Sequence, residues 1–398
     1  MLTLRVLPPR LLRPSPPEPN DLLAFYAEAL RRNWRPIDRA TAVVLSAGAA
    51  VLNLGALGSS GAWGNGWNGG EEALLAPGLD RRAHLSMAAR KGVHRLLNPG
   101  AFPLGVNPLK NKRLFAARCR AAGLPVPDGF DPERGTLEAW LDGIDALVAK
   151  PNYASKGQGV VGFRRAGAEW VADGEPIDPA ALFGRLRAAL ARGGVVQQAC
   201  ATHPELRDLS PGALPTLRVM TAIDEAGGVE VCDRTIRLSA GGPRAVDNFN
   251  AGNIVAGLDG EGGITRAFRR ERGRVVELAR HPTSGAPLAG RRPPDLEAAL
   301  ALAARAHEAF RAGFGVVGWD VGLTDGGPVL IEGNWSPGTD ILALVSGRAL
   351  GDTRLGALYR HQLGRLSPEA WRAARPVERD RKGPEPAAEA ESLPVGAR

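Results

Sequence analysis

Two acidic residues and an asparagine near the C-terminal end of the chain have the types and spacing of a cation site. Asp320, Glu332 and Asn334 lie within Gly318–Gly338, among valine, leucine and isoleucine residues. Carboxylates that oppose each other across a hairpin repel, and a divalent cation removes that repulsion. Mg²⁺ typically takes one or two carboxylates together with phosphate oxygens and water. We therefore expect a magnesium site here; the alternative is a pair of exposed charges close to a turn.

A β-hairpin would bring the three side chains together. Asp325-Gly326-Gly327 favours a three-residue hairpin loop. Such a loop fixes the cross-strand pairs, which become Thr324–Pro328, Asp320–Glu332 and Val321–Ile331. Side chains alternate along a strand, so Glu332 and Asn334 share one face of the hairpin with Asp320.

A lysine followed by a glycine-rich loop is the second signal. Lys150 ends the apolar segment Ala146–Lys150, and Ser155, Lys156, Gly157 and Gly159 follow it. A loop of this kind presents backbone N–H groups to a polyphosphate while the lysine neutralises charge. The GxxxxGK[ST] pattern is missing. An ordinary hairpin turn with two glycines explains the loop equally well.

The elements that would position these residues follow from hydrophobic periodicity. Helices are expected near residues 111–122, 182–190 and 296–310. Strands are expected near residues 146–150, 160–163, 195–198, 217–223, 229–238, 316–323 and 329–334. Runs of strands interrupted by helices, several in hairpins, indicate an α+β fold.

Taken together, these motifs resemble the ATP-grasp superfamily over about residues 108–350. The order of the motifs matches, and Asp320 followed by Glu332-x-Asn334 is the most specific part. Leu214–Thr221 looks like the sugar-transfer-associated ATP-grasp group, which is similar to α-L-glutamate ligase-related proteins. The resemblance implies two α+β lobes that hold ATP between them. Residues 21–108 instead indicate a mainly helical region, which departs from the alternating strands and helices of the family's usual N-terminal domain.

The resemblance also implies roles for individual residues. Mg²⁺ would be held by Asp320, Glu332 and Asn334, and Arg218 would steady the γ-phosphate and acyl-phosphate oxygens as a catalytic residue with Lys150. The residues implied to bind ATP are Lys112 and Lys150 at the phosphates, Ser155, Lys156, Gly157 and Gly159 in the loop over them, Gln197, Gln198 and Cys200 around adenine, and Glu205 or His203 at the ribose.

The implied activity is that of an ATP-dependent ligase. It would join a small-molecule carboxylate to an amine through an acyl phosphate, in cell-surface polysaccharide or related biosynthesis. Two alternatives stay open: a kinase that phosphorylates a hydroxyl on the same scaffold, and a non-catalytic nucleotide-binding protein of a polysaccharide-synthesis complex. The residues do not identify the co-substrates.

Composition places the chain among ordinary globular proteins. It has 398 residues, 44% hydrophobic and 23% charged, with a net charge of +8 and three cysteines that lack metal or disulfide spacing. No signal peptide is evident, and the uncharged run 40–70 is expected to form a buried helix and loop, so we expect a cytoplasmic protein. The expected regions are a Pro-rich arm (1–20), a helical region (21–108), the ATP-grasp domain (109–365), and a helix end with a disordered tail (366–398).

Basic residues gather in one stretch. Residues 81–120 contain ten lysines and arginines and no acidic residue, which suits a polyphosphate or an anionic surface. Aromatic residues for base stacking are too few for nucleic-acid binding. Five basic residues in this stretch have no expected role in ATP binding. They could hold the protein at the inner membrane face or at a lipid-linked glycan; a solvated basic face is the alternative. These residues are Arg81, Arg82, Arg90, Lys91 and Arg95.

Three further predictions concern individual residues. Arg234 and Arg237 are three apart on a strand, so at most one of them faces the cleft. Asn248, Asn250 and Asn253 belong to a loop that could reach the phosphates or form a plain turn. His307, on the apolar stripe of a helix, is expected to be a structural residue rather than a base.

Overall fold

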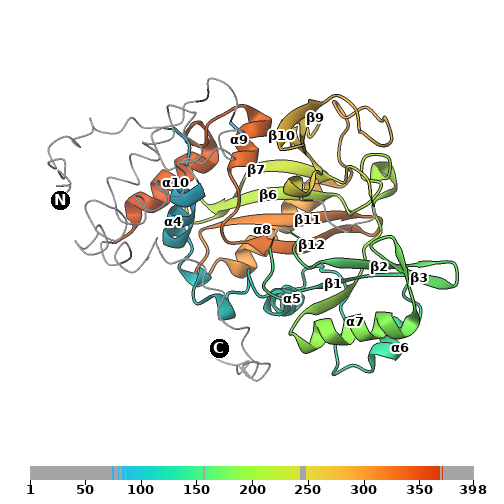
Figure 1. The fold of residues 1–398 in the computed structure, drawn as a ribbon. Coiled ribbons are helices and arrows are strands. Elements are labelled where there is room, and N and C mark those ends of the chain that lie inside the picture. Colours follow the sequence, from blue (N-terminus) through green and yellow to red (C-terminus); the bar gives the residue numbers. More distant parts are fainter. Residues whose placement is uncertain are drawn as a thin grey trace, which may run out of the picture.

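A computed structural model describes residues 83–85, 87–155, 157–242 and 248–367, together with the single positions 74, 75, 79 and 370. The Pro-rich arm, the uncharged run 40–70, Lys156 and the C-terminal tail lie outside the described residues, as do Arg81 and Arg82. Two antiparallel sheets carry the fold (Figure 1). This arrangement confirms the α+β class.

The smaller sheet has two helices on its outer face. Its strand order is β4 (Glu175–Ile177), β3 (Glu169–Ala172), β2 (Val161–Ala166), β1 (Ala146–Lys150) and β5 (Val195–Gln198). Helices α6 (Leu137–Leu141) and α7 (Pro179–Ala191) pack their leucines on it around the buried Leu147 and Phe163. Asp178 caps α7 by accepting a hydrogen bond from the backbone N–H of Ala181.

The larger sheet contains the predicted hairpin. Its strand order is β10 (Arg274–Leu278), β9 (Ile264–Glu271), β8 (Ile254–Leu258), β7 (Val229–Leu238), β6 (Thr216–Ile223), β11 (Val316–Thr324) and β12 (Gly327–Asn334). Helix α8 (Leu296–Phe310) covers one face, where the main core includes the buried residues Val219, Trp319 and Phe310.

Cross-strand register assigns the polar residues to the other face of this sheet. One row runs from Glu332 through Asp320 and Arg218 to Thr235. The next runs from Gly322 through Thr216, Arg237 and Val255 to Phe268. Residues directly opposite each other in neighbouring strands point to the same side, so chemistry-bearing side chains gather on the face that α8 leaves open.

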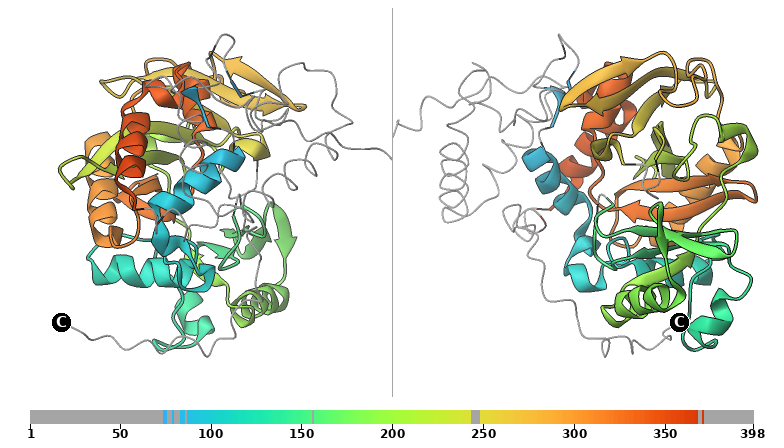
Figure 2. Two further views of the ribbon diagram at one scale, coloured as in Figure 1. Left: turned by 90° about the vertical axis from the view of Figure 1, so that its left-hand side faces the viewer. Right: turned by 45° about the vertical axis from the view of Figure 1, so that its right-hand side comes forward.

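Four helices complete the described fold. Helix α5 (Lys112–Ala121) begins at Asn111, whose side chain accepts from the backbone N–H groups of Arg113 and Leu114. Helices α4 (Met87–Leu97) and α10 (Arg354–Arg365), far apart in sequence, lie side by side (Figures 1 and 2), and α9 (Asp340–Ser346) covers β7–β9. Short 3₁₀ helices are η4 (Pro99–Ala101), η5 (Leu104–Val106), η6 (Pro204–Leu206), η7 (Phe249–Ala251) and η8 (Leu350–Asp352).

The two sheets meet through the segment after β5. His203 N donates to Leu323 O at 3.1 Å, and Asp325 N donates to Ala201 O at 3.1 Å. The chain leaving the smaller sheet is thereby fixed to the turn between β11 and β12. No helix within the described residues is both long and apolar enough to cross a membrane.

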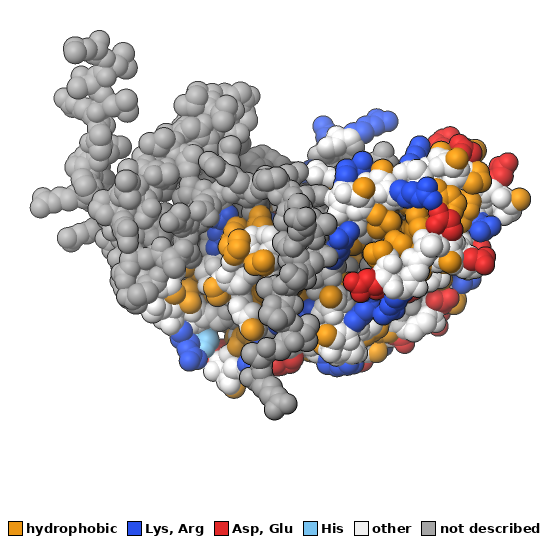
Figure 3. Space-filling view, turned by 90° about the horizontal axis from the view of Figure 1, so that it is seen from below, with side chains coloured by type: hydrophobic (Ala, Val, Ile, Leu, Met, Phe, Trp, Pro, Cys, Tyr) orange, Lys and Arg blue, Asp and Glu red, His pale blue; other side chains and the backbone are white. Residues whose placement is uncertain are grey.

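The structure corrects the membrane hypothesis for two of its five basic residues, and the side chains of Arg81, Arg82 and Lys91 lie outside the described residues. Arg90 is buried and pairs with Asp340 at 2.9 Å, and Arg95 is buried with its guanidinium 4.5 Å from the centre of the Phe102 ring. Of the five basic residues assigned to a membrane, these two face the interior instead, because each has a partner there. On the face seen in Figure 3, positive and negative side chains are interspersed.

Candidate functional site

The hairpin places Asp320 opposite Glu332, as predicted, but it does so with a different loop. The turn has two residues, so Thr324 pairs with Gly327 rather than with Pro328. A register shift next to Asp320 then inserts Ile331, which leaves Val321 opposite Leu330. The expected Val321–Ile331 pair is therefore wrong. The bulge restores the pairing of the two carboxylates, and a bulge of this kind is a common way to aim a side chain near a functional site.

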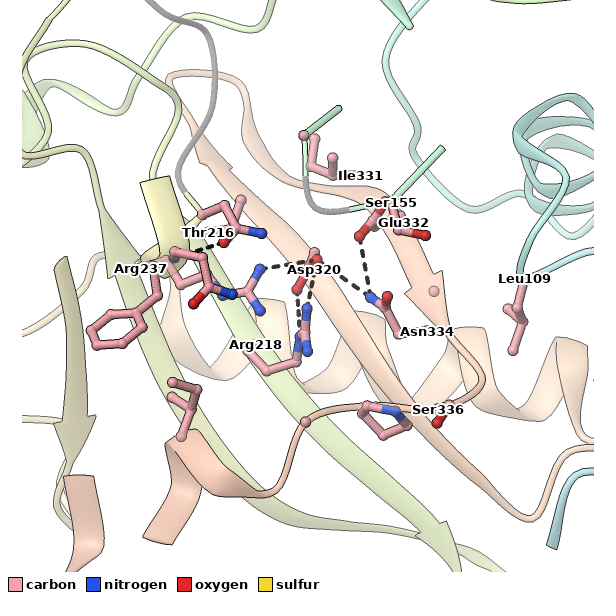
Figure 4. A pocket seen from close by; sticks show the side chains of 18 of the residues that line it. Leu109, Ser155, Thr216, Arg218, Arg237, Asp320, Ile331, Glu332, Asn334 and Ser336 are labelled. Carbon is pink, nitrogen blue, oxygen red and sulfur yellow. Dashed lines mark hydrogen bonds and ion pairs between the residues drawn. The ribbon is translucent and has the colours of Figure 1, made fainter. Parts of the chain in front are cut away.

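Asp320 is a buried carboxylate held by two arginines (Figure 4). Arg218 donates to it through Nε at 2.5 Å and Nη2 at 2.9 Å, and Arg237 donates through Nη1 at 3.3 Å. Burial raises the pKa of Asp320, but Arg218 and Arg237 outweigh that effect and hold the pKa well below its usual range. Arg237 faces the site, whereas Arg234 turns to the backbone carbonyl of Asp259, which confirms that at most one of them reaches the cleft.

Glu332 has the opposite electrostatic character. Burial, followed by the neighbouring Asp320 charge, raises its pKa, while Lys112 opposes the rise. The side-chain amide of Asn334 donates to Glu332 Oε1 at 3.3 Å and to Asp320 Oδ2 at 3.4 Å. Two acidic residues and an amide thus converge, as the sequence predicts.

These donors suit a hard cation that brings further ligands with it. Within the described residues, no group of three or more His, Cys, Asp or Glu side chains is placed to hold a metal ion. Two carboxylates and one amide oxygen match the partial set that Mg²⁺ takes when phosphate oxygens and water complete its shell. Asp320 keeps acceptor capacity beside its arginine bonds, because a carboxylate offers about four lone-pair sites.

A cavity of about 750 Å³ lies over this face of the sheet and reaches the smaller lobe. Lys110, Lys112 and Lys150 line it together with Asp320, Glu332 and Asn334. Lys112 Nζ donates to Ala154 O at 2.8 Å and to Asn152 O at 3.3 Å. Burial lowers the pKa of Lys112 to about 8, with Lys150 and Lys110 adding to the effect and Glu332 opposing it. Three ammonium groups at one end of a cavity favour an anionic occupant.

The glycine-rich loop borders the same end of the cavity. Ser155 and Gly157 line it, and Ser155 Oγ accepts a hydrogen bond from Lys110 Nζ at 2.6 Å. Gly159 has a φ of +69°, and a Cβ there would lie 2.8 Å from Pro151 Cγ. Glycine is therefore required at this turn for reasons of space as well as conformation.

The four residues implied at the nucleobase and ribose are not among those lining this cavity. Gln197 and Gln198 lie on β5, opposite Val148 and Leu147. Cys200 is half-buried and burial raises the pKa of its thiol, and Glu205 is exposed on η6. Their nucleotide roles, like those of all residues in the predicted site, stay predictions.

One face of α4 contributes residues that sequence reasoning missed. Arg90 binds Asp340, His94 Nδ1 lies 3.1 Å from Ser336 Oγ, and the Asn98 amide donates to Trp335 O at 2.6 Å. Arg90 and His94 lie four residues apart on one side of α4, and Asn98 follows four residues later, directly after the helix ends at Leu97. All three contact the segment 335–340, which follows Glu332-x-Asn334 and lines the cavity. The signal available in the sequence was the four-residue spacing of these three residues, which lie in a segment interpreted only as a basic stretch.

Asn248 and Asn250 line the cavity as well. His307 is fully buried: its Nδ1 lies 2.7 Å from Thr221 Oγ1 and its Nε2 lies 2.9 Å from Phe314 O. Burial lowers its pKa to about 4. The structural role predicted for His307 is confirmed.

Comparison with known proteins gives one family match. A model of the family described as sugar-transfer associated ATP-grasp matches residues 94–356. No curated protein sequence matches the chain.

Solved structures show weaker likeness. An ADP complex of N5-carboxyaminoimidazole ribonucleotide synthetase is 13% identical, with 59% of this chain and 47% of that chain covered and a TM-score of 0.35. D-alanine–D-alanine ligase from Bacillus anthracis is 14% identical (66% and 69% covered, TM-score 0.37), and L-amino acid ligase from Bacillus licheniformis is 17% identical (60% and 43% covered, TM-score 0.33). The chain thus spans about half the length of the first of these structures.

Proposed function

Because the chain belongs to the sugar-transfer associated ATP-grasp family, we propose that it is an ATP-dependent ligase that joins a carboxylate to an amine. The resemblance drawn from the motifs and the ATP-grasp fold that it implied are thereby confirmed. The observation that carries the proposal is the convergence of Lys112, Lys150, Asp320, Glu332 and Arg218 on one cavity. The family's description favours a role in polysaccharide or related biosynthesis.

The proposed role of each residue follows from its charge. Lys112 and Lys150 face the phosphates of ATP, with Ser155 and Gly157 of the loop beside them. Asp320, Glu332 and Asn334 would hold Mg²⁺, and the ion would supply positive charge that neutralises the phosphates. Asp320 also orients the Arg218 guanidinium, so that its remaining N–H groups point to where the γ-phosphoryl group is transferred. Phosphoryl transfer of this kind depends mainly on positioning and charge neutralisation.

The reaction has two steps. A carboxylate oxygen attacks the γ-phosphorus and the bond to ADP breaks, which gives an acyl phosphate. The amine nitrogen then attacks the acyl carbon, the C–O bond to phosphate breaks, and an amide forms with loss of one proton from nitrogen. Arg218 and Lys150 contact the oxygens on which negative charge collects in the first step.

Product stoichiometry tests the proposal. With a panel of amino acids and sugar acids as carboxylates and amines, we expect ADP and inorganic phosphate to be released in equal amounts whenever an accepted pair is present. A kinase acting on a hydroxyl would release ADP with no inorganic phosphate. Nucleotide binding without any substrate-dependent ADP release would favour a non-catalytic accessory protein instead.

A further inference from the structure

The cavity continues from Asp320 along β7, β8 and β9, into a part that the steps above do not use. Arg237, Val255 and Phe268 follow one another across these strands. Arg270 lies two residues beyond Phe268 on β9 and therefore points to the same side. Arg237, Val255 and Arg270 all line the cavity. This part thus lies next to the reaction centre but is separate from the phosphate-facing lysines.

Its lining combines positive charge with an apolar surface. The Arg270 guanidinium lies 5.7 Å from the centre of the Phe249 ring. Phe249 is 5% exposed and Val255 is fully buried, and Ile341 and Leu342 of α9 complete the apolar wall. The acidic lining residues next to this part are already engaged, because Asp320 bonds to Arg218 and Arg237, and Asp340 bonds to Arg90. An anion would therefore meet guanidinium groups rather than uncompensated carboxylates.

A buried hydroxyl gives independent support. Thr235 lines the cavity between Arg218, its partner on β6, and Gly257, its partner on β8. Its Oγ1 is buried and has no hydrogen-bond partner among the described residues. Buried polar groups are normally hydrogen-bonded, and an unsatisfied one is costly. An occupant with a polar end at this position would supply the missing partner.

We propose that this part of the cavity is the subsite for the carboxylate substrate, and that this substrate carries its carboxylate on an apolar group. The carboxylate lies among Arg237, Thr235 and Arg270, and the apolar group packs on Phe249, Val255, Ile341 and Leu342. The inference rests on the proposed function, since it assigns the acid that the ligase activates.

Calorimetry with simple probes tests the subsite without knowledge of the natural substrate. Octanoate, acetate and octanol are each titrated into the full chain saturated with MgADP. Octanoate should bind at least tenfold more tightly than acetate, because each buried methylene adds roughly fourfold in affinity. It should also bind at least tenfold more tightly than octanol, which lacks the charge that a guanidinium recognises. Equal affinities for octanoate and octanol would overturn the proposal.

Single substitutions test which residues bind octanoate. Arg270→Gln should weaken octanoate binding roughly tenfold or more and leave octanol unchanged, and Arg270→Lys should restore most of the loss. Arg274→Gln, an exposed neighbour on β10 outside the cavity, is the matched control. Ile341→Asn, on the half-exposed side of the apolar wall, should weaken octanoate but not acetate. Unchanged octanoate binding in both Arg270→Gln and Ile341→Asn would overturn the proposal.

The two proposals fail separately. ADP affinity is measured in the same samples, and it should be the same in Arg270→Gln as in the unmodified chain. Absence of ADP binding to the unmodified chain would contradict the proposed function. Normal ADP binding without selective octanoate binding would contradict the subsite alone.

Discussion

At the scale of single residues, the site is a balance between buried charges. Asp320 is kept ionised by two arginines, whereas the pKa of Glu332 is raised by burial and by Asp320. Neither carboxylate could be buried alone at acceptable cost, since an uncompensated charge in the interior is strongly unfavourable. The three lysines across the cavity place positive charge where phosphates would lie. The arrangement is that of a site whose charges are completed by an anion and a cation together.

Lys150 and Lys112 give the prediction at this scale. An ammonium facing a phosphate makes a charge-assisted contact worth about 1.5–3 kcal/mol. Lys150→Ala and Lys112→Ala should therefore each weaken ATP binding roughly tenfold to a hundredfold. Calorimetry with MgATP measures the loss, and Arg120→Ala, exposed on the same helix as Lys112, is the control. ATP affinity equal to that of the unmodified chain in both lysine variants would refute the phosphate roles.

At the scale of elements, the hairpin shows how far sequence reasoning reaches. Alternation of apolar residues and a glycine turn were enough to predict the strands and to place Asp320 opposite Glu332. The bulge at Ile331 could not be foreseen. The same turn residues are compatible with a two-residue and with a three-residue hairpin loop, and only packing of the hairpin on the sheet decides between the two. Two compensating differences, a shorter turn and one inserted residue, left the carboxylate pair where it was expected.

Other elements were missed for a physical reason. The strands β8, β9 and β10 carry arginines and glycines among short apolar runs, so their pattern is weak, and the sheet edge they form was not predicted. The contacts of α4 could not be predicted from the sequence either. Arg90 and His94 of α4, and Asn98 directly after it, contact residues more than two hundred positions away, and local patterns carry no information about such contacts.

The link from α4 to the site gives the prediction at this scale. His94 Nε2 lies 2.6 Å from the hydroxyl of the fully buried Tyr359, and its other ring nitrogen contacts Ser336. His94→Leu should destabilise the protein by about 1–3 kcal/mol, because it leaves the buried Tyr359 hydroxyl and the half-buried Ser336 hydroxyl without their histidine partner. Tyr359→Phe removes one of those hydroxyls, so the double variant should be less destabilised than the sum of the two single variants. Urea unfolding measures all four proteins, and strict additivity would contradict the contact.

At the scale of the whole molecule, one cavity lies over the larger sheet and reaches the smaller one, and residues of α4 and α9 help to line it. Buried histidines are distributed through this assembly. Burial lowers the pKa of His84 and of His307 to about 4, and it lowers that of His94 well below its ordinary value of 6.5. Trp319, on β11 beside Asp320, donates to Thr221 Oγ1 at 2.8 Å, and this hydroxyl contacts His307. The site's central strand is thus supported by a neutral histidine.

Stability should therefore depend on pH in a defined direction. The unfolded chain takes up protons at His84 and His307 as pH falls below about 6.5, and the folded chain does so only nearer 4. The free energy of unfolding should fall between these values, by at most about 1.4 kcal/mol per pH unit for each group. Urea unfolding at pH 7 and at pH 5 measures the change, and His307→Leu should make it smaller. Equal stability at both pH values would contradict the neutral buried state.

The claim that unites these scales is that the β11–β12 hairpin is the metal and phosphate site of an ATP-dependent enzyme. The most direct test is Mg²⁺-dependent ADP release by Glu332→Gln, which removes one charge and keeps the size of the side chain. We expect turnover to be abolished while circular dichroism and the unfolding transition stay close to those of the unmodified chain, with Glu169→Gln, exposed on β3 and outside the cavity, as the control. A folded Glu332→Gln protein that releases ADP at the rate of the unmodified chain would contradict the assignment.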